Sequence, residues 1–143
     1  MLDNNISMKK LSCFLLFACF SFGAKAQCDT IANMCLKHIP PFISDGQNYR
    51  ALLIDQELAE FQSTFFGGST YRIAACSGTT EGDLIFTVYD TERNLLYTKE
   101  KYKNAPYWDL NFKNTIDCII EAKLDKNQNK GSGCAVLHIG FKQ

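Results

Sequence analysis

Residues 116–124, with the sequence IDCIIEAKL, decide the fold class because apolar and polar side chains alternate along them. Asp117, Glu121 and Lys123 face one way, and the opposite face is apolar. A period of two is typical of a half-buried β-strand, since successive side chains of an extended chain point to opposite faces. The stretch therefore predicts a strand with one face in a core. The apolar face consists of Ile116, Cys118, Ile120, Ala122 and Leu124.

The same alternation recurs on both sides of this segment. Residues 84–89 (LIFTVY) are apolar on both faces, as in the middle strand of a sheet covered on both sides. Turns rich in Gly, Asn and Asp separate the segments at intervals of roughly ten residues. This spacing predicts a single, mostly β domain, an antiparallel β-sandwich, since a parallel sheet needs crossover helices. The other predicted strands are residues 49–54, 60–65, 71–76, 95–98, 108–112 and 135–141.

One short helix is predicted before the strands. Ile31, Met34, Cys35 and His38 follow the i, i+3, i+4, i+7 spacing of an amphipathic helix, with Asp29 as its N-cap. The two prolines at positions 40 and 41 end it. We therefore divide the chain into a helix and linker over residues 27–48 and a β-sandwich domain over residues 49–143.

The first 26 residues have the pattern of a secretory signal peptide. Lys9 and Lys10 precede an apolar run over residues 11–22, and Ala24 and Ala26 are the small residues of a cleavage site. The run is shorter than the ~20 residues that cross a bilayer, so no transmembrane anchor is predicted. The segment predicts export to the periplasm or beyond. As an alternative, residues 16–19 (LFAC) are similar to a lipobox, which would attach a lipid to Cys19.

The charge balance argues against a nucleic-acid partner. The chain has 15 Lys and Arg against 15 Asp and Glu. Lys9, Lys10, Lys25 and Asp3 leave with the signal segment, so the mature chain is mildly acidic. A protein without basic excess cannot gain the counterion release that drives binding to phosphate backbones.

Five cysteines remain after signal removal, and disulfides are the expected state of an exported protein. Cys76 and Cys134 both lie on the less apolar face of their strands, which predicts that they pair. Cys118 faces the apolar side and is predicted to be a buried free thiol. With Leu124 opposite Cys134 in a hairpin, Cys118 would lie roughly 20 Å from Cys134. The remaining cysteines are Cys28 and Cys35, which we do not expect to pair with each other.

No catalytic motif is present, so we predict a protein that is not an enzyme and needs no cofactor. His38 and His138 fall on separate predicted elements, and the turn residues Ser69 and Ser77 are typical backbone caps. The alternative is a small cell-envelope hydrolase or a metal-dependent enzyme. Its discriminating feature would be a pocket in which carboxylates or a histidine converge.

Three carboxylates near turns are weak candidates for a Ca²⁺ site, because hard cations take oxygen ligands from turns. They are Asp83, Asp90 and Glu92, and they do not follow EF-hand spacing. Ordinary turn chemistry, in which Asp90 and Asn94 hydrogen-bond their own backbone, is the competing explanation.

Aromatic and basic residues gather between positions 95 and 112. Tyr97, Lys101, Tyr102 and Tyr107 are the predicted contact residues for a protein or glycan partner. Trp108 is expected in the core beside Phe86, Leu110 and Phe112. The lysines at positions 99, 101 and 103 are expected to form a solvated sheet edge that discourages strand pairing.

Four segments carry a resemblance to a known family. FFGGSTYRI (65–73), DLIFTVYD (83–90), WDLNFKNTIDCIIEAKL (108–124) and GCAVLHIGF (133–141) resemble bacterial pre-peptidase C-terminal (PPC-like) domains. The resemblance spans residues 57–141 and implies a jelly-roll-like β-sandwich. The extra cysteines and the N-terminal helix depart from that pattern. The chain is also similar to small exported proteins of Bacteroidota-type bacteria, a likeness that implies export and says nothing about activity.

Overall fold

A computed structural model describes residues 23–78, 82–102, 105–127 and 131–143. The predicted signal residues 1–22, including Cys19, lie outside this part of the chain. Helix α2 (Gly23–Cys35) is followed by the 3₁₀ turn η2 (Leu36–His38), and a second 3₁₀ turn, η3 (Lys99–Tyr102), follows β6. The strands are β1 (Ile43–Ser44), β2 (Tyr49–Leu53), β3 (Leu58–Phe65), β4 (Ser69–Cys76), β5 (Leu84–Asp90), β6 (Leu95–Thr98), β7 (Tyr107–Phe112), β8 (Ile116–Leu124) and β9 (Gly133–Lys142).

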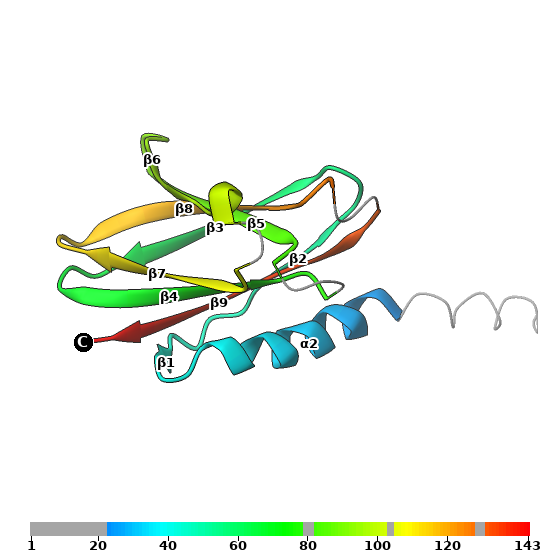
Figure 1. The fold of residues 1–143 in the computed structure, drawn as a ribbon, viewed down its shortest axis with the longest axis horizontal. Coiled ribbons are helices and arrows are strands. Elements are labelled where there is room, and N and C mark those ends of the chain that lie inside the picture. The colour runs from blue at the N-terminus through cyan, green and yellow to red at the C-terminus, as the bar shows by residue number, and fades with distance from the viewer. Residues whose placement is uncertain (1–22, 79–81, 103–104, 128–130) are drawn as a thin grey trace, which may run out of the picture.

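The strands form two antiparallel sheets that stack face to face (Figure 1). In the first sheet β9 lies between β4 and the pair β1 and β2, and β7 is the last strand beyond β4. The second sheet has the order β3-β8-β5-β6. The predicted antiparallel β-sandwich with one short helix is therefore confirmed. β6 and β7 end their respective sheets at neighbouring positions in the sandwich, joined along the chain by η3.

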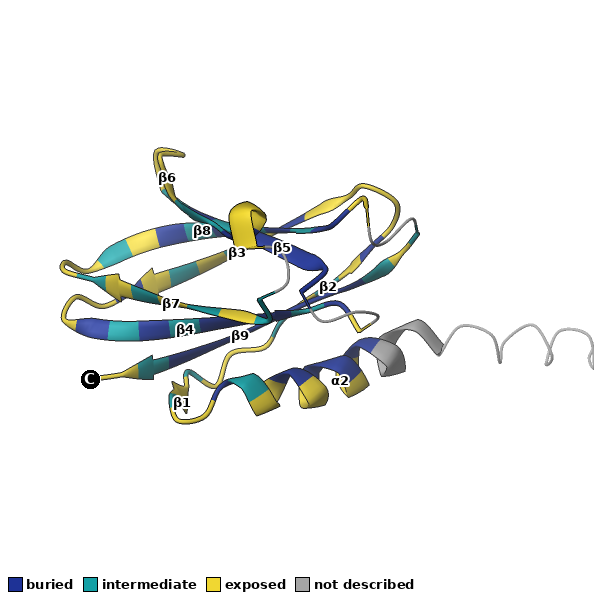
Figure 2. Ribbon diagram, in the orientation of Figure 1, coloured by how far each residue is buried: buried dark blue, intermediate teal, exposed yellow. Residues whose placement is uncertain are grey.

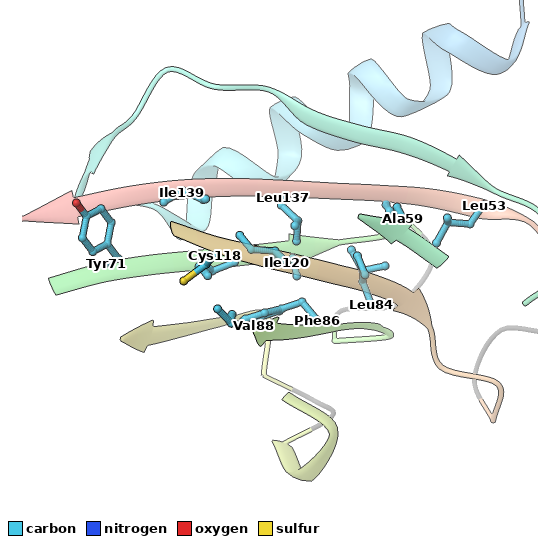
Figure 3. Close-up of a cluster of buried hydrophobic side chains, with 14 of the residues drawn as sticks. Leu53, Ala59, Tyr71, Leu84, Phe86, Val88, Cys118, Ile120, Leu137 and Ile139 are labelled. Carbon is cyan, nitrogen blue, oxygen red and sulfur yellow. The ribbon is translucent and has the colours of Figure 1, made fainter. Parts of the chain in front are cut away.

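The core lies between the two sheets, where the alternating faces meet. Ile120, Phe86 and Leu137 are fully buried and come from β8, β5 and β9, as Figure 3 shows. Bands of buried and less buried residues follow one another along β4 and β8 in Figure 2. Truncating a large side chain such as Phe86 to Ala would cost about 3 to 5 kcal/mol of stability. Cys118 faces this core as a buried free thiol, which confirms the prediction.

Helix α2 covers the outer face of the first sheet (Figure 1). Ile31, Ala32 and Cys35 on one face of the helix are buried against Ala74 and Val136 of the sheet. The helix begins by Gly23, so Asp29 lies inside it and is not its N-cap. The residues before Asp29 include Ala, Lys and Gln, which extend a helix readily. No helix in the described part of the chain has the length and apolar character to span a membrane.

The predicted Cys76–Cys134 disulfide is wrong. The described cysteines form Cys28–Cys134, with Cα atoms 5.6 Å apart, and Cys35–Cys76, with Cα atoms 5.9 Å apart. Positions seven apart share a helix face, so both helix cysteines point at the sheet that carries the other two. The bonds therefore attach α2 to β9 and to the end of β4, an arrangement that strand alternation alone does not reveal.

The predicted hairpin between residues 116–124 and 135–141, with Leu124 opposite Cys134, is also wrong. Leu124 pairs with Leu84 of β5, not with Cys134. β8 belongs to the second sheet and β9 to the first, so the connection between them crosses from one sheet to the other. Because both strands have one strongly apolar face, their pattern fits partners in either sheet.

Candidate binding site at the edge of the sandwich

The predicted contact residues fall on the β6, η3 and β7 segment, at one edge of the sandwich. β6 and η3 are largely exposed in Figure 2. Leu95 is 58% exposed and Leu96 is 43% exposed, an unusual degree for leucines in strands. Apolar side chains exposed next to aromatic rings mark surfaces that contact other molecules.

A stack of four aromatic rings runs from the core to this edge. The ring of Phe86 lies 5.6 Å from that of Tyr97, and Tyr97 lies 5.5 Å from Trp108 at an interplanar angle of 20°. Tyr102 stacks on Trp108 at 4.5 Å and is half exposed. Trp108 packs against the core, as predicted. We call Phe86, Tyr97, Trp108 and Tyr102 the aromatic stack. It presents a ring to solvent on a rigid support.

Lys99 anchors η3 to the start of β5. Its side chain is fully buried, and Nζ donates hydrogen bonds to the carbonyl oxygens of Leu84 (2.8 Å) and Gly82 (3.3 Å). Burial lowers the pKa of Lys99 to about 8, and the nearby carboxylate of Asp83 opposes this shift. The prediction of a solvated lysine edge is therefore wrong for Lys99, whereas Lys101 is exposed. Lys103 lies outside the described residues.

The hydroxyl group of Tyr97 is the only buried side-chain oxygen or nitrogen without a hydrogen-bond partner in the described part of the chain. Burial raises the pKa of Tyr97 to about 12, and Tyr102 adds to the shift. The hydroxyl therefore stays protonated at every physiological pH. A buried donor without an acceptor costs free energy, so this hydroxyl reduces the stability of the fold.

A hollow of about 410 Å³ lies between the edge strands β6 and β7. We call it the edge groove. Its lining includes no carboxylate, and Lys113 is its charged residue. The groove is open to solvent and continues from Tyr97 of the aromatic stack. Its apolar lining consists of Val88, Leu96, Leu110, Phe112 and Ile116.

Tyr107 belongs to a different cluster, because neighbouring residues of a strand point to opposite faces. Its ring lies over the guanidinium of Arg72, 3.9 Å from the ring centroid. Arg72 also binds Asp109 (2.7 and 2.9 Å) and donates to the carbonyl oxygen of His38 (3.2 Å). These contacts fix the chain after α2 to the outer face of the first sheet. The structure thus joins Tyr97 to Tyr102 through Trp108 and leaves Tyr107 on the other face of β7.

The three calcium candidates do not converge. Asp83 and Asp90 flank opposite ends of β5, and Asp83 is buried with the Ser77 hydroxyl donating to it. Asp90 accepts hydrogen bonds from the backbone N–H groups of Glu92 (2.9 Å) and Asn94 (2.8 Å). Within the described ranges, no three His, Cys, Asp or Glu side chains gather as metal ligands would. The competing explanation, turn chemistry, accounts for Asp90.

The two histidines also lie apart. His138 is buried beneath α2, with Nε2 2.9 Å from the carbonyl oxygen of Ala32. Burial lowers the pKa of His138, which favours a neutral, structural ring. The ring of His38 lies 6.0 Å from that of Tyr107, on the exposed side of the first sheet.

Sequence reasoning missed the edge groove and the buried Lys99. The groove forms from two strands of different sheets, and no sequence pattern states that they are neighbours. For Lys99, the available signal is that it closely follows apolar and aromatic residues. The two further lysines that come after it make the segment look like a solvated edge instead.

Comparison with known proteins gives a fold and no family. No protein-family model matches the chain, and no curated protein matches its sequence. Its structure is similar to the crystal structure of PliG from Aeromonas hydrophila, a periplasmic inhibitor of g-type lysozyme. The TM-score is 0.52 at 8% identity, covering 71% of this chain and 89% of PliG. At this identity the likeness shows a shared fold alone. It agrees with the predicted β-sandwich and does not confirm the PPC-like resemblance.

Proposed function

We propose that this chain is an exported, non-catalytic protein that binds and inhibits a glycan-cleaving enzyme of the lysozyme class. The contact surface in this proposal is the β6, η3 and β7 edge, led by Tyr102, with Lys101 beside it and Tyr107 at its border. The observation that carries the proposal is the stacking of half-exposed Tyr102 on Trp108 at 4.5 Å.

A ring held this way suits protein binding. Interface energy concentrates in a few aromatic and arginine residues that are rigid before binding, because an ordered side chain loses little entropy. Trp108 supports the Tyr102 ring, and the buried Lys99 fixes the backbone of the turn that carries it. Exposed Leu95 and Leu96 of β6 add apolar area to the same edge of the sandwich.

The partner class is supported by the shared fold with a periplasmic lysozyme inhibitor and by the disulfides typical of exported proteins. An inhibitor of this kind needs a complementary surface and no reactive groups, which fits the described residues, where no three metal-ligating side chains gather and the two histidines lie apart. The predicted export would place it where cell-wall glycans are cleaved.

The experiment is an inhibition assay with the protein recovered after export. A g-type lysozyme and a lysozyme of another type are assayed on cell-wall suspensions with increasing amounts of the protein. We expect loss of lysis with one of them and binding in calorimetry at a matching concentration. No inhibition and no binding by either enzyme would refute the proposed partner class.

Two further arms test the alternatives. Binding to soluble peptidoglycan fragments without enzyme would favour a glycan partner. Turnover of ester, peptide or glycoside substrates, lost in His138→Ala, would favour the hydrolase alternative. Leu52→Ala, on the exposed side of the distant strand β2, serves as the matched control for Tyr102→Ala.

A further inference from the structure

The free edge of β7 has backbone groups ready to pair with another strand. The N–H of Ala75 donates to the carbonyl oxygen of Pro106 (3.0 Å), which sets the phase of the ladder between β4 and β7. In an antiparallel ladder, backbone groups alternate between the two sides of a strand. Those of Trp108 and Leu110 therefore point to β4, and those of Asp109 and Asn111 point outward.

The side chains beneath this edge form the edge groove. Leu110 and Phe112 of β7 face Leu96 and Tyr97 of β6 across the hollow. A strand added to β7 would place every second side chain over this apolar lining. The outward backbone groups and the groove therefore fit the same extended occupant.

The charged side chains around the groove indicate what kind of segment would bind there. Lys113 lines the groove and Lys101 lies exposed near its aromatic end, and neither forms an ion pair within the described residues. An acidic segment would complement the charge of both lysines.

We propose that the β7 edge and the edge groove take up an extended, acidic segment of a partner protein by strand addition. The inference rests on the proposed function in one respect, that the occupant belongs to a protein partner. A glycan would leave the outward N–H groups of β7 without a ladder.

The probe is the acetylated hexapeptide amide EVTVEV, whose valines lie on one face and whose glutamates lie on the other. It is added to the ¹⁵N-labelled protein recovered after export, and amide exchange is followed by NMR. We expect the amides of Asp109 and Asn111 to exchange about tenfold more slowly at saturation, because a ladder bond protects them. The peptides EVPVEV and KVTVKV serve as controls for the ladder and for charge, and we expect weaker binding of both.

Two variants with matched controls follow. Asn111→Pro removes the outward N–H at a position where an edge strand tolerates proline, and Asn111→Ala removes the side chain alone. We expect about tenfold weaker peptide binding for the proline variant and near-unchanged binding for the alanine variant. Lys113→Gln should weaken binding of EVTVEV severalfold, because it removes the charge that lines the groove.

The outcomes separate this inference from the proposed function. Unchanged exchange at Asp109 and Asn111 would overturn strand addition, and equal peptide binding by Lys113→Gln and the original protein would overturn the acidic occupant. This holds whether or not a lysozyme is inhibited. Protection that rises with protein concentration in the absence of peptide would show that a second copy is the occupant, which also overturns the proposal. Should Asn111→Pro not fold, the exchange data and Lys113→Gln still decide.

Discussion

The ammonium group of Lys99 donates a 2.8 Å hydrogen bond to the carbonyl oxygen of Leu84, and so joins η3 to the first residue of β5. This bond holds the turn that carries Tyr102. Burial of the lysine lowers its pKa to about 8, so the side chain loses its charge as the pH rises above about 8.

The first prediction concerns the pH dependence of stability. Between about pH 8 and 10 the unfolded chain holds a proton on Lys99 that the folded chain has lost, because the unfolded pKa is the ordinary 10.5. The stability of the original protein relative to Lys99→Met should therefore rise across this window, by up to about 3 kcal/mol. Urea unfolding of both proteins at several pH values measures it. If the difference in unfolding free energy between the two proteins does not change from pH 7 to 10, Lys99 is not buried with a lowered pKa.

The second prediction concerns Tyr102. Once a partner is found, Tyr102→Ala should weaken binding by about 1 to 2 kcal/mol without loss of fold, since it truncates a supported ring. Tyr107→Ala should weaken binding by a similar amount if the surface extends to the other face of β7. Calorimetry with circular dichroism as the folding check measures both. Unchanged affinity in both variants would remove the β6, η3 and β7 edge from consideration.

The third prediction concerns the disulfides. Peptide mapping without reduction should link Cys28 to Cys134 and Cys35 to Cys76. The double variant Cys35→Ser, Cys76→Ser should lose about 2 to 4 kcal/mol of stability, because α2 is no longer attached to β4. A mapped Cys76–Cys134 peptide would reverse this assignment.

The fourth prediction concerns the thiol of Cys118. Burial raises its pKa to about 11, and its side chain is 2% exposed. The native protein should therefore not react with iodoacetamide at pH 8 on a timescale of minutes, whereas protein in urea should be labelled at this site alone. Rapid labelling of the folded protein would show that the core opens there.

Sequence alone determined the fold class and most of the strands, but not the start of α2 or the short strand β1. Residues 116–124 alternate except at Ile119, and they form a strand because a period of two can bury one face only in an extended chain. The same reasoning gave the buried thiol of Cys118, which shares the face of Ile120, and the core position of Trp108.

Tertiary structure alone decided which strands are neighbours. Alternation predicts which face of a strand is apolar, but an apolar face packs equally well in either sheet. The strand that pairs with Leu124 could therefore not be predicted from it. The disulfides depended on where α2 lies, since its cysteines reach β4 and β9 only after docking. Lys99 has the sequence context of a solvated edge and is buried because two carbonyl oxygens at the start of β5 accept its hydrogen bonds. Interactions between residues far apart in sequence fix these features, and no local pattern records them.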